Sequence, residues 1–289
     1  MLWNKARRSK NVNDTRQGKD ARTLTGTTLA AGLAAVALAG AGLYSTLDTP
    51  ADVIAPAPSY TLNHPLPQPS VEPEEDLQLM FVQSVLGDTE DTWQQLFAQM
   101  GRDYPLPTLT LFENGVVSGC GFASSSSGPF YCPSNQQVYL DLGFFNKLEQ
   151  QFAVVGDFAR AYIIAHEIGH HVQLELGLSE PFEKALLEQQ PVSGDGGLEV
   201  RAELQADCLA GVWAHHAQQR RDWMEPGDIE AALHAAAVFG DDQLQASRNA
   251  KVRPETFSHG TSRQRVNWFK TGFASGLPET CDTFTADVL

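Results

Sequence analysis

The sequence predicts an α+β fold with a mixed N-terminal part and a mainly helical C-terminal part, carried on a single N-terminal transmembrane helix. Three observations support this prediction: an uncharged stretch of 25 residues near the N-terminus, short strand-like segments between residues 108 and 142, and three helical patterns after residue 152. Hydrophobic residues make up 42% of the 289 residues and charged residues 19%, which is typical of a folded protein. We divide the chain into a basic tail (1–26), a transmembrane anchor (27–47), a Pro-rich acidic spacer (48–76) and a folded domain (77–289).

The anchor is predicted from the uncharged stretch between Arg22 and Asp48. As a helix with a rise of about 1.5 Å per residue it would reach ~37 Å, enough for a hydrocarbon core of ~30 Å. Basic residues precede it, so the N-terminus is expected in the cytoplasm and the domain outside it, in the periplasm or the extracellular space. The protein is thus expected at the cell membrane as a single-pass protein, held by residues 27–47. A signal peptide cleaved near Ala37-Leu38-Ala39 is the alternative.

The charge of the chain is unevenly distributed. The net charge is −15, of which residues 1–26 carry +5 and the remainder −20. A domain this acidic offers few of the Lys and Arg side chains that contact phosphates, which excludes nucleic acid as a partner. Seven prolines between residues 50 and 73, followed by acidic residues, indicate an extended spacer rather than a packed element.

The folded domain is expected to begin near Leu77 and to start with short strands. Alternating apolar and polar residues predict strands at Thr108–Glu113 and Gln137–Leu142. Helical periodicity then predicts three helices, over Phe152–Leu176, Gly197–Gln218 and Asp228–Phe239.

Four cysteines suit an oxidising location. Cys120 and Cys132 flank a Ser- and Gly-rich loop, which favours a local disulfide between them and leaves Cys208 and Cys281 as the second pair. Four cysteines permit three pairings, and proximity only favours this one. Four free or metal-binding thiols are the alternative, although no C-x-x-C spacing occurs.

The spacing of His166-Glu167-Ile168-Gly169-His170 predicts a metal site on the first of these helices. Histidines at positions i and i+4 lie on the same helix face, so both imidazoles can bind one zinc ion. The side chain of Glu167 would then accept a proton from water at the metal.

A third ligand is expected from the second helix. Gln173 and Leu176 stand where the metzincin pattern requires Gly and His, so that pattern fails. Glu203 and Asp207 share one face of the second helix. We expect Glu203 to bind the zinc ion and Asp207 to accept a hydrogen bond from a metal-binding histidine.

Taken together, these motifs resemble the bacterial "putative neutral zinc metallopeptidase" family, whose members are membrane-anchored proteins of the gluzincin type. The resemblance covers nearly the whole chain except the Pro-rich spacer. It rests on the stretches Arg7–Val12, Cys120–Pro133, Val138–Leu142, His166–His170, Glu203–Trp213, Gly240–Asp242 and Phe257–Ser262. It implies a zincin-like fold, one zinc ion per chain and peptidase activity on a peptide or protein substrate.

Two further residues are candidates for the site. His259, followed by Arg265, is similar to a His-Pro…Arg segment of related membrane gluzincins. We expect His259 to donate a hydrogen bond to the oxyanion formed during peptide hydrolysis, and Arg265 to begin the next helix and pair with Asp207 or another acidic residue. The alternative is a turn at His259 that only caps a helix.

The sequence thus predicts a membrane-anchored zinc peptidase with Glu167 as general base. One alternative is an envelope scaffold or binding protein that retains zinc for stability without catalysis. Another is a metal-binding module without a cleft for peptides. The peptidase and the scaffold differ in the effect of replacing Glu167. A peptidase would lose turnover while keeping its metal, whereas a scaffold has no turnover to lose.

Overall fold

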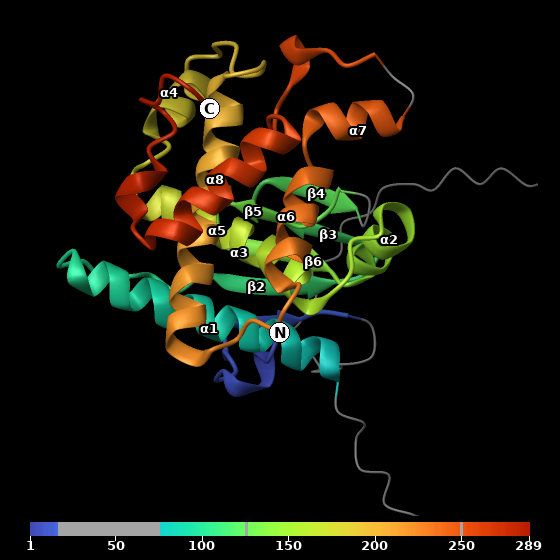
Figure 1. Ribbon diagram of the computed structural model, residues 1–289, viewed down its shortest axis with the longest axis vertical. Helices are drawn as coiled ribbons and strands as arrows, with labels where there is room; N and C mark the ends of the chain where they lie inside the picture. The colour runs from blue at the N-terminus through green and yellow to red at the C-terminus, as the bar shows by residue number, and fades with distance from the viewer. Residues whose placement is uncertain (17–75, 125–126, 249–250) are drawn as a thin grey trace, which may run out of the picture. The chain divides into compact units, whose positions relative to one another are not determined.

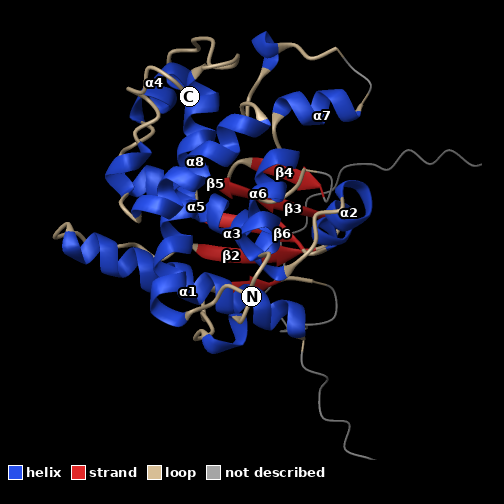
Figure 2. Cartoon of the chain, viewed as in Figure 1, coloured by secondary structure: helices blue, strands red, loops and turns tan. Residues whose placement is uncertain are grey.

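A four-stranded sheet with the order β1-β2-β6-β5 runs through the centre of the domain (Figures 1 and 2). The computed structural model describes residues 1–16, 76–124, 127–248 and 251–289. β2 pairs in parallel with β1 and β6, and β5 pairs antiparallel with β6. The strands are β1 (Val12–Asp14), β2 (Thr108–Phe112), β5 (Phe130–Cys132) and β6 (Gln137–Asp141), and a separate antiparallel hairpin consists of β3 (Gly115–Ser118) and β4 (Gly121–Ser124).

Helices make up most of the remaining described residues. They are α1 (Leu77–Gln99), α2 (Gly143–Phe152), α3 (Asp157–Leu176), α4 (Glu180–Leu187), α5 (Leu198–Arg221), α6 (Asp228–Val238), α7 (Asp241–Ser247) and α8 (Ser262–Ser275). Residues 108–112 and 137–141 confirm the two predicted strands, each one residue shorter than expected. α3, α5 and α6 confirm the three predicted helices, and α3 begins five residues later than expected because Ala153 and Gly156 adopt positive φ angles.

Helix boundaries follow from local chemistry. The Asp76 side chain accepts a hydrogen bond from the Leu79 backbone N–H and begins α1. α8 begins with a capping box formed by Thr261 and Gln264. α3 ends at Gly177, whose φ of 70° suits glycine better than residues with a Cβ atom.

The hydrophobic core surrounds α3. This helix is buried along most of its length and shares one cluster of apolar side chains with β2, β6, α1, α5 and α6. Strand side chains in the cluster are Leu109, Leu111, Val138 and Leu140, and those of α3 include Phe158, Ile164, Ile168 and Val172. Close packing fixes the side chains of such a helix, so groups on α3 have well-defined positions.

Residues 1–16 belong to the same unit as the rest of the described chain, although the sequence predicts a separate basic tail over residues 1–26. β1 forms an edge strand beside β2, with Val12 opposite Leu109. Arg7 forms an ion pair with Glu90 at 2.7 Å, and Arg16 forms one with Asp76 at 2.8 Å. Basic residues that indicate a tail in the sequence therefore pair with acidic residues of α1 and its N-cap.

The predicted fold class needs correction in two respects. The fold is mixed α/β, because α1 connects the parallel neighbours β1 and β2, whereas an α+β fold segregates strands from helices. The predicted domain begins at Leu77 and so leaves out β1. The predicted transmembrane helix is also not supported, since no helix of the described residues is long and apolar enough to cross a membrane. Residues 27–47 and most of the spacer, 48–75, lie outside the described residues.

Both predicted disulfides are present. Cys120 in the turn between β3 and β4 is bonded to Cys132 of β5, and Cys208 of α5 is bonded to Cys281 near the C-terminus. The Cys120–Cys132 disulfide ties the hairpin to the edge of the sheet, and the Cys208–Cys281 disulfide ties the C-terminal segment to α5.

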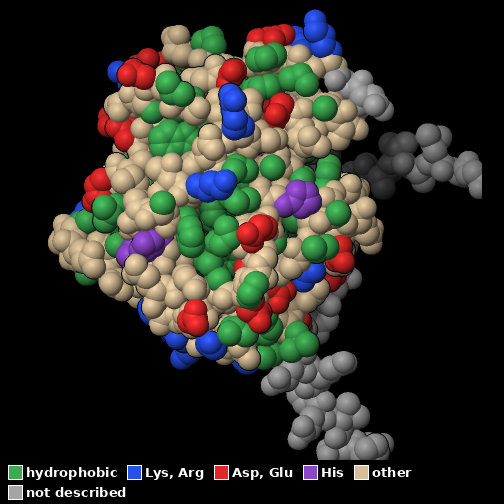
Figure 3. Space-filling model, viewed as in Figure 1, with side chains coloured by type: hydrophobic (Ala, Val, Ile, Leu, Met, Phe, Trp, Pro, Cys, Tyr) green, Lys and Arg blue, Asp and Glu red, His purple; other side chains and the backbone are tan. Residues whose placement is uncertain are grey.

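Charged side chains of both signs lie on the face of the domain drawn in Figure 3. On the face of the described residues in Figure 3, Lys and Arg side chains are scattered among acidic and apolar ones and form no continuous basic patch.

Candidate metal centre

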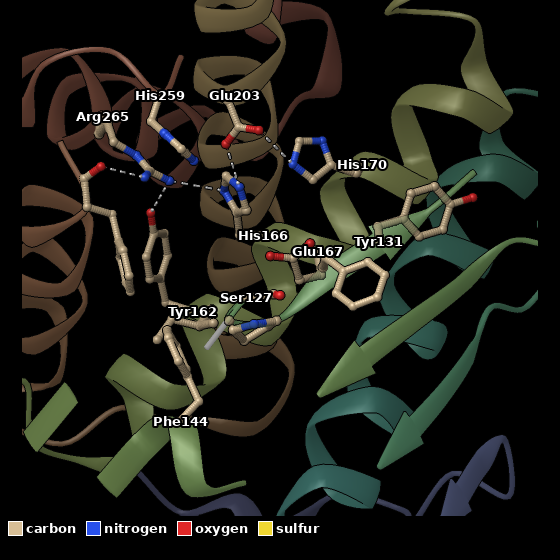
Figure 4. A pocket seen from close by; sticks show the side chains of 15 residues that line it. Ser127, Tyr131, Phe144, Tyr162, His166, Glu167, His170, Glu203, His259 and Arg265 are labelled. Carbon is tan, nitrogen blue, oxygen red and sulfur yellow. Dashed lines mark hydrogen bonds and ion pairs between the residues drawn. The ribbon is translucent and has the colours of Figure 1, made fainter. Parts of the chain in front are cut away.

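α3 and α5 bring the predicted metal-binding residues together. His166 and His170 lie one turn apart on α3, and their Nε2 atoms face Glu203 of α5 (Figure 4). The distance from His166 Nε2 to Glu203 Oε2 is 3.1 Å, and that from His170 Nε2 to Glu203 Oε1 is 3.4 Å. One ligand atom from each of the three residues lies within 4.8 Å of the others.

Close packing of the two helices makes this geometry possible. A Cβ atom at Gly169 would lie 2.9 Å from the Ala206 backbone oxygen and 3.1 Å from its Cα atom. Glycine within the motif therefore lets the α3 backbone approach α5, so the Glu203 side chain reaches both imidazoles. A larger residue at position 169 would push the helices apart.

The distances fit a zinc ion. Zinc binds imidazole nitrogen and carboxylate oxygen at about 2.0–2.2 Å, so two ligands of a tetrahedral site lie about 3.4 Å apart. The separations of 3.1 and 3.4 Å, each to a different oxygen of the Glu203 carboxylate, are close to that spacing. Two imidazoles and one carboxylate are also the donor set of catalytic zinc sites, which keep the fourth position open.

A buried group of three side chains holds His166 in place. The Nδ1 atom of His166 donates to Asp207 Oδ1 at 2.9 Å, which directs Nε2 toward Glu203. Arg265 of α8 forms two hydrogen bonds with the same carboxylate, at 2.8 and 2.9 Å. The Tyr162 hydroxyl also donates to Asp207. Asp207 is fully buried, so this arrangement is rigid.

Electrostatics in this group favours positive charge at the metal-binding face. Burial alone would lower the pKa of His166, but the carboxylates of Asp207 and Glu203 raise it to about 10. Burial would raise the pKa of Asp207, but Arg265 and His166 lower it to about 2. The carboxylates therefore stabilise positive charge at His166, either on a protonated imidazole or on a metal ion bound to it.

A second chain of hydrogen bonds orients His170. Its Nδ1 atom donates to Gln173 Oε1 at 2.8 Å, and the Gln173 amide donates to the Ala202 carbonyl and to Gln205 Oε1. Gln205 in turn donates to the Cys281 carbonyl at 2.9 Å. Each metal-binding imidazole therefore has a fixed tautomer, set by Asp207 for one and by Gln173 for the other.

The metal-binding residues open onto a cavity of about 410 Å³. Glu167 lies in it beside His166, and aromatic side chains form much of its wall (Figure 4). One side of the cavity is formed by β5, which supplies Phe130 and Tyr131 at the edge of the sheet. The Tyr131 hydroxyl is bonded to His171 Nδ1 at 2.9 Å, so the ring is held against the core.

His259 lines the opposite side of the cavity, near Arg265 and Glu203 (Figure 4). Asp241 at the start of α7 holds its loop: one carboxylate oxygen accepts hydrogen bonds from the backbone N–H groups of Ser258, His259 and Gly260. The other oxygen lies 3.5 Å from His259 Nδ1. Burial would lower the pKa of His259, but Asp241 and the charge of Glu203 raise it overall.

Six of the predicted site residues line one cavity: His166, Glu167, His170, Glu203, His259 and Arg265. Asp207 does not line it and lies buried behind His166, bonded to His166 and Arg265. Of the partners predicted for Arg265, Asp207 is the one it binds, and Arg265 lies in the first turn of α8 as expected. The segment His259–Ser262 also forms a turn that caps a helix, as the alternative expected, because Thr261 is the N-cap residue of α8.

Three residues with a part in this site were missed. Tyr162 was assigned to the buried face of the helix, although it precedes His166 by four residues. Gln173 follows His170 by three residues. Extending the helical spacing of the motif in both directions would have found them. Asp241 carries no such spacing signal, because its partners lie some 18 residues away along the chain, but it belongs to the stretch Gly240–Asp242 on which the family resemblance rests.

The fold and the site define the class of this protein: a mixed α/β domain in which, among the described residues, one group of two histidines and a glutamate that could hold a metal ion faces a cavity. The chain belongs to the family described as "Putative neutral zinc metallopeptidase", which matches residues 1–284. This confirms the resemblance seen in the sequence.

Relatives of the chain occur in distant bacteria. It is 47% identical over 215 residues to the uncharacterized protein YpfJ of Escherichia coli (strain K12), covering 74% of each chain. It is 42% identical over 216 residues to an uncharacterized protein of Mycobacterium tuberculosis (strain H37Rv), covering 71% of this chain and 72% of that protein. No solved structure matches the chain significantly.

Proposed function

We propose that the protein is a zinc-dependent peptidase that uses Glu167 as general base. One observation carries the proposal: a zinc-compatible set of two imidazoles and one carboxylate shares a cavity with the carboxylate of Glu167. Family membership supports zinc and peptidase activity. The relatives are uncharacterized, so the roles of individual residues rest on the geometry alone.

His166, His170 and Glu203 would hold the ion through Nε2, Nε2 and a carboxylate oxygen. A zinc ion in such a site supplies a Lewis acid and lowers the pKa of water to about 7. The buried carboxylate of Asp207 and the amide of Gln173 keep both imidazoles oriented for binding.

Glu167 is placed to move the proton. Its neighbours on α3 fix its backbone, and its side chain is 9% exposed, at the surface of the cavity. We infer that its carboxylate accepts a proton from the attacking water and then delivers it to the nitrogen of the leaving amine.

His259 would stabilise the negative charge that develops on the substrate carbonyl oxygen. Asp241 holds the loop by three backbone hydrogen bonds, and its carboxylate favours the protonated imidazole. A donor held in place in this way needs little reorganisation during the reaction. Arg265 binds Asp207 and so braces the wall instead of contacting substrate.

An extended peptide is the substrate that the cavity suits. Within the described part of the sheet, β5 pairs only with β6, so its other edge is open beside the cavity. A peptide can add to such an edge by backbone hydrogen bonds while its side chains enter neighbouring pockets.

A location outside the cytoplasm is part of this proposal. The two disulfides support it, because disulfides persist in oxidising compartments.

The proposal is tested with Glu167→Gln and a matched control, Glu175→Gln, which alters a half-buried carboxylate on the same helix that does not line the cavity. Zinc content is measured by elemental analysis and turnover with a mixed peptide library read by mass spectrometry. We expect one zinc ion per chain in all three proteins and loss of cleavage only in Glu167→Gln. A chain that binds zinc but cleaves no peptide would favour the alternative, a zinc-stabilised scaffold.

A further inference from the structure

A second cavity adjoins the metal centre on the side of α4. It has a volume of about 260 Å³ and shares Tyr131, His170 and Glu203 with the larger cavity. The metal-binding residues therefore lie between the two cavities. A peptide whose reacting carbonyl is at the metal centre can place a neighbouring side chain in the second cavity.

Size indicates that this cavity holds a side chain. Pockets that enclose a whole small molecule have volumes of about 300–1,000 Å³. At about 260 Å³ the second cavity is smaller than these. Its position beside the metal-binding residues, not its volume alone, makes it a candidate specificity pocket.

Its lining combines an apolar wall with carboxylates. Leu174, Phe182 and Leu186 supply apolar surface, whereas Glu183 and Glu199 supply carboxylates. Among the described residues that line it, none is Lys or Arg. An occupant with both an aliphatic part and a positive charge would match both features.

Glu199 is the more informative of the two carboxylates. It lies one turn before Glu203 in the first turn of α5 and is only partly exposed. No hydrogen bond or ion pair joins its carboxylate to another described side chain. Glu183, by contrast, accepts a hydrogen bond from Ser179 at 2.6 Å and has no cationic partner among the described residues.

We propose that the second cavity binds the side chain of a Lys or Arg residue next to the cleaved bond. The aliphatic stem packs against Phe182 and Leu186, and the cationic group binds Glu199 and Glu183. Long basic side chains commonly bury their stems on apolar surface while their charged ends reach polar groups. This inference rests on the proposed peptidase function and adds a substrate preference to it.

The test compares peptides that differ only in charge. Fluorogenic peptides carry Lys, norleucine or Glu at each of three positions on either side of a central bond. Norleucine retains the aliphatic stem without the ammonium group. At one position we expect kcat/KM for Lys to exceed that for norleucine by about tenfold, the lower end of the range for a hydrogen bond to a charged group.

Variants locate the preference. Glu199→Gln combined with Glu183→Gln is expected to reduce the ratio of kcat/KM for the Lys peptide to that for the norleucine peptide to about one. The control is Glu188→Gln, which alters an exposed carboxylate at the end of α4 outside the cavity and should leave the ratio unchanged. Equal rates for Lys and norleucine at every position, or a ratio unaffected by the double variant, would overturn the proposal.

A binding measurement separates this inference from the proposed function. Fluorescence anisotropy of the same peptides on the zinc-loaded Glu167→Gln protein requires no turnover. Binding that prefers Lys supports the pocket even if wild type cleaves nothing, whereas cleavage without preference for Lys rejects only the pocket. Neither binding nor cleavage of any peptide would reject both.

Discussion

Replacing Asp207 with Asn tests the buried group behind His166. The side chain keeps its size but loses its negative charge. Arg265, which is 3% exposed, then has no carboxylate partner among the side chains that contact it, and His166 Nδ1 faces an amide that can present either an oxygen or an NH₂ group. We expect loss of both stability and zinc affinity.

The size of the stability loss follows from the structure. Lowering the pKa of Asp207 from 3.8 to about 2 corresponds to about 2 kcal/mol of stabilisation at pH 7. Removing one partner of a buried ion pair typically costs about 3–5 kcal/mol, because the charge of the other partner stays buried without a counter-charge. We therefore expect a loss of about 2–5 kcal/mol. Since the folded pKa is the lower one, this stabilisation is complete above pH 3.8 and disappears as the pH falls toward 2.

Urea denaturation of the zinc-free protein at pH 7 measures this loss. A double variant, Asp207→Leu with Arg265→Met, replaces both charges with apolar groups and should recover most of the stability. It should not recover zinc affinity, measured by chelator competition, because His166 still lacks its acceptor; we expect a deficit of about 10–100-fold. A loss below 1 kcal/mol for Asp207→Asn, or normal zinc affinity in the double variant, would refute this reasoning.

Three further predictions concern other parts of the site and its frame. Asp241→Asn should shift the alkaline limb of the pH dependence of kcat to lower pH, because Asp241 raises the pKa of His259 and activity falls as this imidazole loses its proton; an unshifted limb would argue against a protonated donor. Gln173→Leu should weaken zinc binding about 10–100-fold in chelator competition, and unchanged affinity would show that His170 does not need this amide. Replacing Cys208 and Cys281 by Ser should cost about 4 kcal/mol in urea denaturation, given a sequence separation of 73 residues, and a loss under 1 kcal/mol would contradict the chain-entropy account.

Local spacing explains which parts of the site could be predicted from sequence. His166 and His170 share a helix face wherever that helix lies, and the same holds for Glu203 and Asp207. The meeting of the two pairs could be inferred because zinc needs a third ligand. Contacts that depend on distant segments, such as Asp241 with the His259 loop, have no signature in the spacing of either partner.

The same limit applies to the fold. Longer periodic segments such as α3 and α5 were predicted with one end exact or within a residue and the other end three to five residues off. The three residues of β1 show no alternation long enough to read as a strand, and this strand is defined only by its pairing with β2. Because β1 was not predicted, the predicted fold class was wrong. For the same reason Arg7 and Arg16 were assigned to a tail, although they form ion pairs within the domain.

Parallel pairing of β1 with β2 also affects how the protein is made. Val12 lies beside Leu109, so roughly 100 residues separate the paired strands. A ribosome adds about 5–20 residues per second, so β1 emerges on the order of 5–20 s before β2. Glu90 and Asp76, which form ion pairs with Arg7 and Arg16, are likewise synthesised later. The strand that is translated first can therefore join the sheet only after translation has passed β2.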